Sequence, residues 1–194
     1  MKEMLRRNIE RTTGNSPSAD ECALLADSMF VRSFDRKAML AEEGRVCTHV
    51  YFITRGAAYS GIVNSEGEKF AVQFALEGYW ITDQYSFFSG RPGLYTVETL
   101  EPTEVLMMNR DTFDRVCAAS HTLEHFFRVL ITNAFVALQY RLAKTNAEDA
   151  EHRYLEFARL HPDFVQRIPQ YLIASYLGIK PQSLSRIRKN LAAK

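Results

Sequence analysis

The sequence is poor in cysteine and has no long apolar run. Its three cysteines, Cys22, Cys47 and Cys117, stand singly and far apart, which excludes a disulfide framework and predicts reduced thiols. The longest apolar-rich segment, Phe126–Leu138, contains an arginine and an asparagine and is shorter than the ~20 residues that cross a bilayer. The charged segment Met1–Arg11 lacks the apolar stretch of a secretory signal. We therefore expect a cytoplasmic protein that does not enter a membrane.

Signatures of enzymes and metal sites are also missing. No glycine-rich phosphate loop, nucleophile elbow or pair of catalytic acids stands out. The segment His121-Thr-Leu-Glu-His125 matches the H-x-x-E-H pattern of inverted zinc proteases, but no third acidic ligand lies nearby, so we interpret the match as a coincidence. His49 is alone in its strand region, whereas a cupin metal site needs His-x-His and a further histidine. The sequence thus predicts no catalytic residues, no metal ion and no cofactor, and we do not expect an enzyme.

Acidic residues are absent from the last part of the chain, which has no Asp or Glu between Phe164 and Lys194. The same segment contains a set of basic residues: Arg167, Lys180, Arg186, Arg188, Lys189 and Lys194. Because the net charge of the whole chain is only +1, positive charge is concentrated at this end, as expected for a surface that binds DNA. The alternative is a solvated basic helix at the end of an ordinary domain.

The basic segment also has the residue pattern of a helix-turn-helix. Ala174 is small where a second helix must approach, Gly178 can take the positive φ of a sharp turn, and Pro181 suits the first position of a helix. Apolar residues form the inner face of the two crossing helices: Ile173, Leu177, Ile179, Leu184, Ile187 and Leu191. Together these spacings predict a DNA-binding helix-turn-helix.

The opposite face of the predicted second helix is polar and basic. A turn of about 100° per residue brings together four side chains that can reach base edges: Gln182, Ser185, Arg186 and Lys189. Three others suit contacts with phosphates: Lys180, Ser183 and Arg188. Because arginine recognises guanine and glutamine recognises adenine, each worth ~1–3 kcal/mol of discrimination, this face is expected to read double-stranded DNA.

Upstream of this segment the sequence changes from a short helix to a strand-rich region. Ser18-x-x-Glu21 is a capping box that predicts a helix through about Ser28. From Phe30 to Asn109 short strands without intervening helices predict an antiparallel sandwich or barrel. The expected strands are 49–54, 57–63, 69–76, 95–100 and 104–108, of which the second and third form a hairpin. Asn109 is expected to cap a helix over Arg110–Ala119.

A longer helix is predicted over about Thr122–Lys144, and it is apolar on more than one stripe. The apolar positions are Leu123, Phe126, Phe127, Leu130, Ile131, Phe135, Leu138 and Leu142. One stripe suffices to pack on a single domain, so the second predicts a twin helix in a homodimer, the alternative being a helix buried inside a monomer. The expected interface consists of Leu123, Phe127, Leu130, Ala134 and Leu138. The polar stretch Thr145–Asp149 is interpreted as a hinge, which gives domains at 1–120, 121–145 and 146–194.

The expected fold is α+β: an N-terminal antiparallel β-roll, a long dimerisation helix and a C-terminal helical helix-turn-helix domain. This order resembles the cyclic AMP receptor protein/FNR superfamily of bacterial transcription regulators, whose roll is a cyclic-nucleotide-binding-like double-stranded β-helix. The resemblance rests on Leu40-x-x-x-Gly44, His49-Val-Tyr-Phe-Ile-x-x-Gly56, Gly67, Gly78-x-Trp-Ile81, Ile173-Ala-Ser-x-Leu-Gly-Ile179 and Leu184-Ser-Arg-Ile-Arg188. It places Arg186 where the family has a base-reading arginine. It implies a homodimer that binds promoter DNA and contacts RNA polymerase.

The sequence departs from the family at its ligand cassette. Members that bind cyclic AMP use a Glu for the ribose hydroxyl and an Arg for the cyclic phosphate, and these elements align with Thr82-Asp83-Gln84 and Gly93-Leu94-Tyr95. Asp83 can still accept a hydroxyl, but no arginine stands in the phosphate position, so cyclic AMP is not expected to bind. The effector is unknown, and its expected pocket is Trp80, Thr82, Asp83, Gly93, Leu94 and Tyr95.

Two further departures concern the FNR cluster and the wing. The FNR branch holds an iron–sulfur cluster with four cysteines, more than this chain has. Relatives carry a β-hairpin wing after the recognition helix, whereas this sequence ends soon after Leu191, so we expect a wingless variant. A second hypothesis remains beside the DNA-binding regulator: a roll that binds a small molecule, whose C-terminal helices mediate protein interaction.

Overall fold

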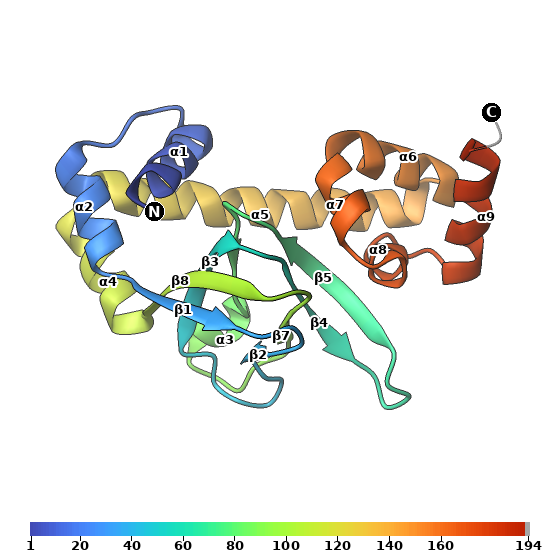
Figure 1. Cartoon of the computed structure of the whole chain (residues 1–194), viewed down its shortest axis with the longest axis horizontal. Coiled ribbons are helices and arrows are strands. Elements are labelled where there is room, and N and C mark those ends of the chain that lie inside the picture. Colours follow the sequence, from blue (N-terminus) through green and yellow to red (C-terminus); the bar gives the residue numbers. More distant parts are fainter. Residues whose placement is uncertain (193–194) are drawn as a thin grey trace.

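The computed structural model describes residues 1–192, so Lys194, counted above among the basic residues, lies outside the described part. Figure 1 shows a β-roll and a group of N-terminal helices on one half of a long helix, and a cluster of C-terminal helices on its other half. No helix within residues 1–192 is both long and apolar enough to cross a membrane.

The roll consists of two antiparallel four-stranded sheets. The first has the order β1 (Phe30–Phe34), β8 (Thr103–Asn109), β3 (His49–Arg55) and β6 (Trp80–Ile81). The second has the order β2 (Met39–Ala41), β7 (Thr96–Thr99), β4 (Ala58–Val63) and β5 (Lys69–Ala75). The predicted hairpin is confirmed, since β4 pairs with β5. β7 and β8 belong to different sheets, so the predicted connection at Glu101-Pro102 carries the chain from one sheet to the other.

Two helices of this half follow the local signals in the sequence. Helix α2 (Ala19–Asp27) has the predicted capping box, in which the Ser18 Oγ accepts a hydrogen bond from the Glu21 N–H and the Ser18 N–H donates to Glu21 Oε2. Helix α4 (Arg110–Ala119) is capped by the Asn109 side chain, as predicted. In both cases the decisive contacts join residues three apart in the chain.

Two other helices of this half were not predicted. Helix α1 (Lys2–Thr13) is mostly charged and buries only Leu5, Asn8 and Ile9, too few apolar positions for a clear stripe. Helix α3 (Gln84–Ser89) interrupts the strand region, where no helix was expected; it begins at Asp83, whose side chain caps it, and ends at Gly90.

Helix α5 (His121–Ala147) spans 27 residues, about 40 Å at 1.5 Å per residue. Its first half lies in a core with α1, α2, α4 and the first sheet, where Leu123, Phe126 and Phe127 are buried. Beyond Ala134 its apolar side chains are exposed. The predicted hinge at Thr145–Asp149 is too long, because α5 continues to Ala147 and only Glu148 and Asp149 separate it from the next helix.

The C-terminal helices are α6 (Ala150–Leu160), α7 (Pro162–Arg167), α8 (Gln170–Tyr176) and α9 (Pro181–Ala192). Their core is continuous with the outer side of the second sheet, because Tyr59, Phe74 and Leu76 of the roll belong to the same cluster of buried residues. A hydrogen bond from the Ala71 N–H to Ser175 Oγ, 2.9 Å long, joins β5 to α8. The helix cluster therefore rests directly on the roll.

Candidate DNA-binding surface and candidate ligand pocket

The turn between α8 and α9 has the geometry that the sequence predicts. Gly178 has φ +64°, and a Cβ there would lie 3.0 Å from Thr145 Cγ2 at the end of α5. The turn is closed by the Ile179 N–H, which donates to the Ala174 carbonyl at 2.8 Å. Ala174 itself has no exposed surface, so a larger side chain has no space there. Helix α9 begins at Pro181, where a backbone N–H is not needed.

One face of α9 is buried and fixes its orientation. Leu184 and Ile187 lie in the core together with Ile173 and Leu177 of the preceding helix and turn, and Leu191 packs against the same cluster. The buried positions follow one another at intervals of three and four, as on one side of a helix. The other side of α9 is consequently held toward solvent.

The exposed side of α9 carries the residues predicted to contact DNA. Those predicted to read bases are all exposed: Gln182, Ser185, Arg186 and Lys189. Of those predicted to contact phosphates, Lys180 and Arg188 are exposed and Ser183 is half-buried. The ion pairs found within residues 1–192 involve none of the four basic side chains in these two groups. Their charges are available to a polyanion.

Arg167 does not belong to this surface, although the sequence counted it among the basic residues of the segment. Its guanidinium pairs with Glu77 at 2.6 Å and also with Glu101. Both carboxylates belong to the roll, and they raise the pKa of Arg167. Arg167 therefore ties α7 to the roll.

An open groove of about 480 Å³ runs beside α9. Its lining includes Arg188 and Lys189 of α9 together with Gln170 and Tyr171 of α8. The Tyr171 side chain is exposed, and a tyrosine hydroxyl or a glutamine amide can donate to a phosphate oxygen. Gln170 and Tyr171 were not among the residues predicted to contact DNA, because nothing in the sequence distinguishes them except their position at the start of the first helix of the motif.

Four of the six residues predicted to form an effector pocket lie together around Asp83. Asp83 has no exposed surface, and its Oδ1 accepts a hydrogen bond from the Ser86 N–H at 3.1 Å. Its Oδ2 accepts from the N–H groups of Leu94 and Tyr95 at 2.8 and 2.9 Å. A Cβ on Gly93 would lie 2.7 Å from the same oxygen, so only glycine fits beside it. The Asp83 carboxylate is bound by the protein's own backbone rather than directed into an open pocket, contrary to the hydroxyl-binding role that the sequence left to it.

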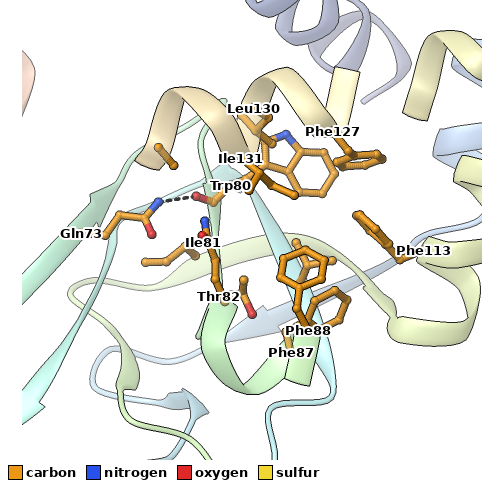
Figure 2. A pocket seen from close by; sticks show the side chains of 13 residues that line it. Gln73, Trp80, Ile81, Thr82, Phe87, Phe88, Phe113, Phe127, Leu130 and Ile131 are labelled. Atoms are coloured by element: carbon orange, nitrogen blue, oxygen red, sulfur yellow. Dashed lines mark hydrogen bonds between the residues drawn. The ribbon is translucent and has the colours of Figure 1, made fainter. Parts of the chain in front are cut away.

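The other two residues, Trp80 and Thr82, line a cavity that does not include Asp83. The Trp80 indole N–H donates to Asn8 Oδ1 at 2.9 Å and its carbonyl accepts from Gln73 Nε2 at 2.8 Å. Figure 2 shows the cavity that they border, between the roll, α3 and α5. Phe87, Phe113 and Ile131 also line it, and its volume is about 60 Å³. A cavity of about 150 Å³ is known to hold one benzene, so this space is too small for a nucleotide as it stands.

The residues predicted for the dimer interface are divided between the core and the surface. Leu123 and Phe127 are buried in the core of their own chain, so we correct the prediction that they contact a partner. Leu130 and Ala134 are half-buried, and Leu138 is exposed. Phe135, Leu138 and Leu142 are 59%, 45% and 58% exposed. With Ile131 they are spaced by four, three and four residues, which is the spacing of a coiled-coil seam.

Comparison with known proteins agrees with this architecture. Residues 31–120 match the family model described as "Cyclic nucleotide-binding domain". No curated protein matches the chain. Among solved structures, FixK2 from Bradyrhizobium japonicum is similar with a TM-score of 0.72 and 16% identity over 85% of each chain.

Two further solved structures have the same arrangement of elements. The catabolite activator protein of Thermus thermophilus has a TM-score of 0.61 and 14% identity over 96% of this chain and 87% of that one. The c-di-GMP responsive global regulator CLP of Xanthomonas campestris has a TM-score of 0.67 and 11% identity over 91% of this chain and 92% of that one. At such identities the likeness shows a shared fold.

The arrangement of a roll, a long helix and C-terminal helices is shared with a solved structure of a putative transcriptional regulator of the crp/fnr family from Eubacterium rectale, which has a TM-score of 0.67 and 13% identity over 91% of this chain and 84% of that one. The family model thus covers the roll of this chain, and the solved structures share its fold over most of its length, as the sequence predicted.

Proposed function

We propose that this protein is a homodimeric transcription regulator that binds double-stranded promoter DNA through α9 and does not respond to cyclic AMP. The observation that carries the proposal is the exposed face of α9. This face presents basic side chains without acidic partners among residues 1–192, on a helix that a buried face holds in a fixed orientation. By analogy with the family we include RNA polymerase among its partners, and we assign the chain no catalytic role.

The two groups of residues on α9 have different proposed tasks. Gln182, Ser185, Arg186 and Lys189 enter the major groove and contact base edges, because they occupy the middle of the exposed face. Lys180, Ser183 and Arg188 contact phosphates on either side of the groove. We add Gln170 and Tyr171 to the phosphate contacts, since they line the groove that Arg188 and Lys189 share.

The apolar seam on α5 and the needs of the motif support the proposed homodimer. A helix-turn-helix protein that reads a two-fold symmetric operator requires two recognition helices about 34 Å apart. The seam of Ile131, Phe135, Leu138 and Leu142 offers a parallel helix pair. We therefore propose that two copies associate through this part of α5.

The absence of a response to cyclic AMP is proposed from the surroundings of Asp83. The Leu94 and Tyr95 N–H groups, at the positions where the family's cassette holds the phosphate, are already bound to the Asp83 carboxylate. A cyclic phosphate would bring a second negative charge to the same donors, and no arginine stands there to offset the repulsion between two buried anions.

Binding measurements on α9 variants test the proposal. A preferred duplex is first selected from a random pool, and binding is then titrated on it and on a scrambled duplex at several salt concentrations. Arg186→Ala should weaken binding to the preferred duplex by ~1–3 kcal/mol and change binding to the scrambled duplex little. Arg188→Ala should weaken binding to both and lower the salt slope by about one ion.

Arg115, an exposed arginine on α4, provides the matched control. Arg115→Ala should leave binding to both duplexes unchanged. Folding should survive all three changes, because none of the three side chains is buried. Equal losses on both duplexes for Arg186→Ala would mean that α9 does not read bases with this residue. A wild-type protein that binds no duplex at low salt would refute the proposed function and favour a protein-interaction role for these helices.

A further inference from the structure

A second cavity lies between the long helix and the helix-turn-helix, apart from the DNA-binding face and from the roll. Its volume is about 250 Å³. Helix α5 contributes Tyr140 and Arg141, α6 and the residue after it contribute Phe157 and His161, and α8 contributes Tyr176. The cavity thus lies where the long helix meets the C-terminal helices.

Flat aromatic surfaces form the walls of this cavity. The ring centroids of Phe157 and Tyr176 are 5.7 Å apart, and those of Phe157 and His161 are 5.3 Å apart. Burial lowers the pKa of His161, so the imidazole is neutral at pH 7. None of the hydrogen bonds within residues 1–192 involves the ring nitrogens of His161. Such walls suit a planar apolar ring.

Arg141 supplies the charge of the cavity. Its guanidinium lies over the Tyr176 ring, 4.2 Å from the centroid. Its two terminal nitrogens donate to the backbone carbonyls of Tyr176 and Val72 at 3.0 and 3.3 Å. A guanidinium has five N–H groups, and Arg141 has no carboxylate partner among residues 1–192, so its half-buried charge retains donors for an anion.

The other charged groups of the lining are already engaged. Lys144 pairs with Glu148 and lies 4.0 Å from Glu156, and Glu156 also accepts a hydrogen bond from the Tyr140 hydroxyl. Arg153 donates to the backbone carbonyls at the end of α8, including that of Leu177. The cationic side chains of the lining outnumber its single carboxylate, so the cavity attracts an anion rather than a cation.

The size of the cavity limits the ligand. A cavity of about 150 Å³ accommodates benzene, so about 250 Å³ has space for one ring and a short acidic side chain but not for a nucleotide. We propose that this cavity binds a small aromatic carboxylate, with its ring packed against the Phe157 and His161 rings and its carboxylate on Arg141. A ligand held in this way contacts α5, α6 and α8 together and fixes the helix-turn-helix against the long helix.

Binding is tested on the full chain without DNA, so the outcome does not depend on the proposed function. The probe is 4-fluorophenylacetate, observed by fluorine NMR, and the matched neutral probe is 4-fluorophenylacetamide. The acid should bind the wild-type protein at least about tenfold more tightly than the amide, because only the acid forms a charge-assisted pair with Arg141. Equal affinities for the two probes would overturn the proposal. Absence of binding of the acid at a concentration of about 10 mM would overturn it as well.

Variants locate the bound probe. Arg141→Met keeps an unbranched apolar chain over Tyr176 and should remove the preference for the acid, whereas the control Arg115→Met, on α4, should preserve it. Ala137→Phe places a ring in the cavity from an exposed position of α5 and should abolish binding of both probes. If Arg141→Met does not fold, Ala137→Phe decides, and undiminished binding to that variant would overturn the proposal.

Discussion

Asp83→Ala should destabilise the roll strongly, because the Asp83 carboxylate is the acceptor for three backbone N–H groups, of which one hydrogen bond is buried and two are partly buried. These groups belong to Ser86 at the start of α3 and to Leu94 and Tyr95 before β7. Segments on either side of α3 are therefore joined through a single side chain with no exposed surface. Alanine removes both oxygens and leaves the three donors without a partner from the protein.

The magnitude follows from the number and the burial of these donors. Leaving a buried N–H unsatisfied costs about 1–3 kcal/mol, and the lower part of this range applies because two of the three hydrogen bonds are only partly buried and the truncated side chain leaves space for water. Losses above about 5 kcal/mol are exceptional for one substitution. We therefore expect Asp83→Ala to lower the free energy of unfolding by about 3–5 kcal/mol. Asp83→Asn keeps the size and one acceptor oxygen, and its effect should be smaller.

Urea denaturation measures this change. Trp80 is the single tryptophan of the chain and is buried against Phe52 and Phe127, so its fluorescence reports unfolding of the roll. With a urea m-value of about 2 kcal/mol per molar, the midpoint should fall by about 1.5–2.5 M. The control Asp114→Ala removes an exposed ion pair with Arg110 and should cost about 1 kcal/mol or less. If Asp83→Ala also lowers the free energy of unfolding by less than about 1 kcal/mol, the stabilising role assigned to the Asp83 carboxylate is refuted.

Three further predictions concern the seam, the ligand and the pH. Leu138→Glu should convert the dimer to a monomer in sedimentation at micromolar concentration. Asn133 is exposed on the other side of α5, so the control Asn133→Glu should leave the dimer intact. A monomeric wild-type protein would refute the proposed interface. Cyclic AMP at millimolar concentration should not change the melting temperature of the protein. A ligand at 100 times its Kd adds ~2.7 kcal/mol to the free energy of unfolding, so a rise in melting temperature that corresponds to this gain would contradict the proposal. Hydrogen bonds from Thr122 and Ser18 lower the pKa of Glu21 from 4.5 to about 2. The stabilising contribution of the Glu21 carboxylate is present above pH 4.5 and is lost as the pH falls toward 2. Glu21→Gln should therefore make the melting temperature depend less on pH over that range. Identical dependences on pH for the wild type and the variant would exclude this role.

The features that were predicted correctly depend on short stretches of sequence. The capping box of α2 and the Asn109 cap of α4 are contacts between residues three apart. In the helix-turn-helix, Ala174, Gly178 and Pro181 are each restricted by the sterics of one tight turn. The class of fold followed from the same local signals, combined with the family resemblance in the order of the elements.

The features that were missed depend on residues far apart in the chain. Helix α1 is ordered through contacts such as that of Asn8 with the Trp80 indole, 72 residues away, and no periodic pattern within α1 shows this. The apolar residues of α5 look alike in sequence, yet the N-terminal helices and the roll cover Leu123 and Phe127 and leave Phe135 exposed. Which stripe is free for a partner is therefore decided by what packs on the helix.

The sequence by itself determined that the chain ends in a helix-turn-helix with a basic outer face, because local sterics and helical periodicity fix both. Only the tertiary structure decided how Asp83 and Arg167 are used. Their residue types allow a ligand-binding acid and a DNA-binding base, but the carboxylate is bound to the backbone of Ser86, Leu94 and Tyr95, and the guanidinium is bound to Glu77 and Glu101 of the roll. A charged side chain acts through the partners that surround it, and those partners come from distant segments that folding brings together.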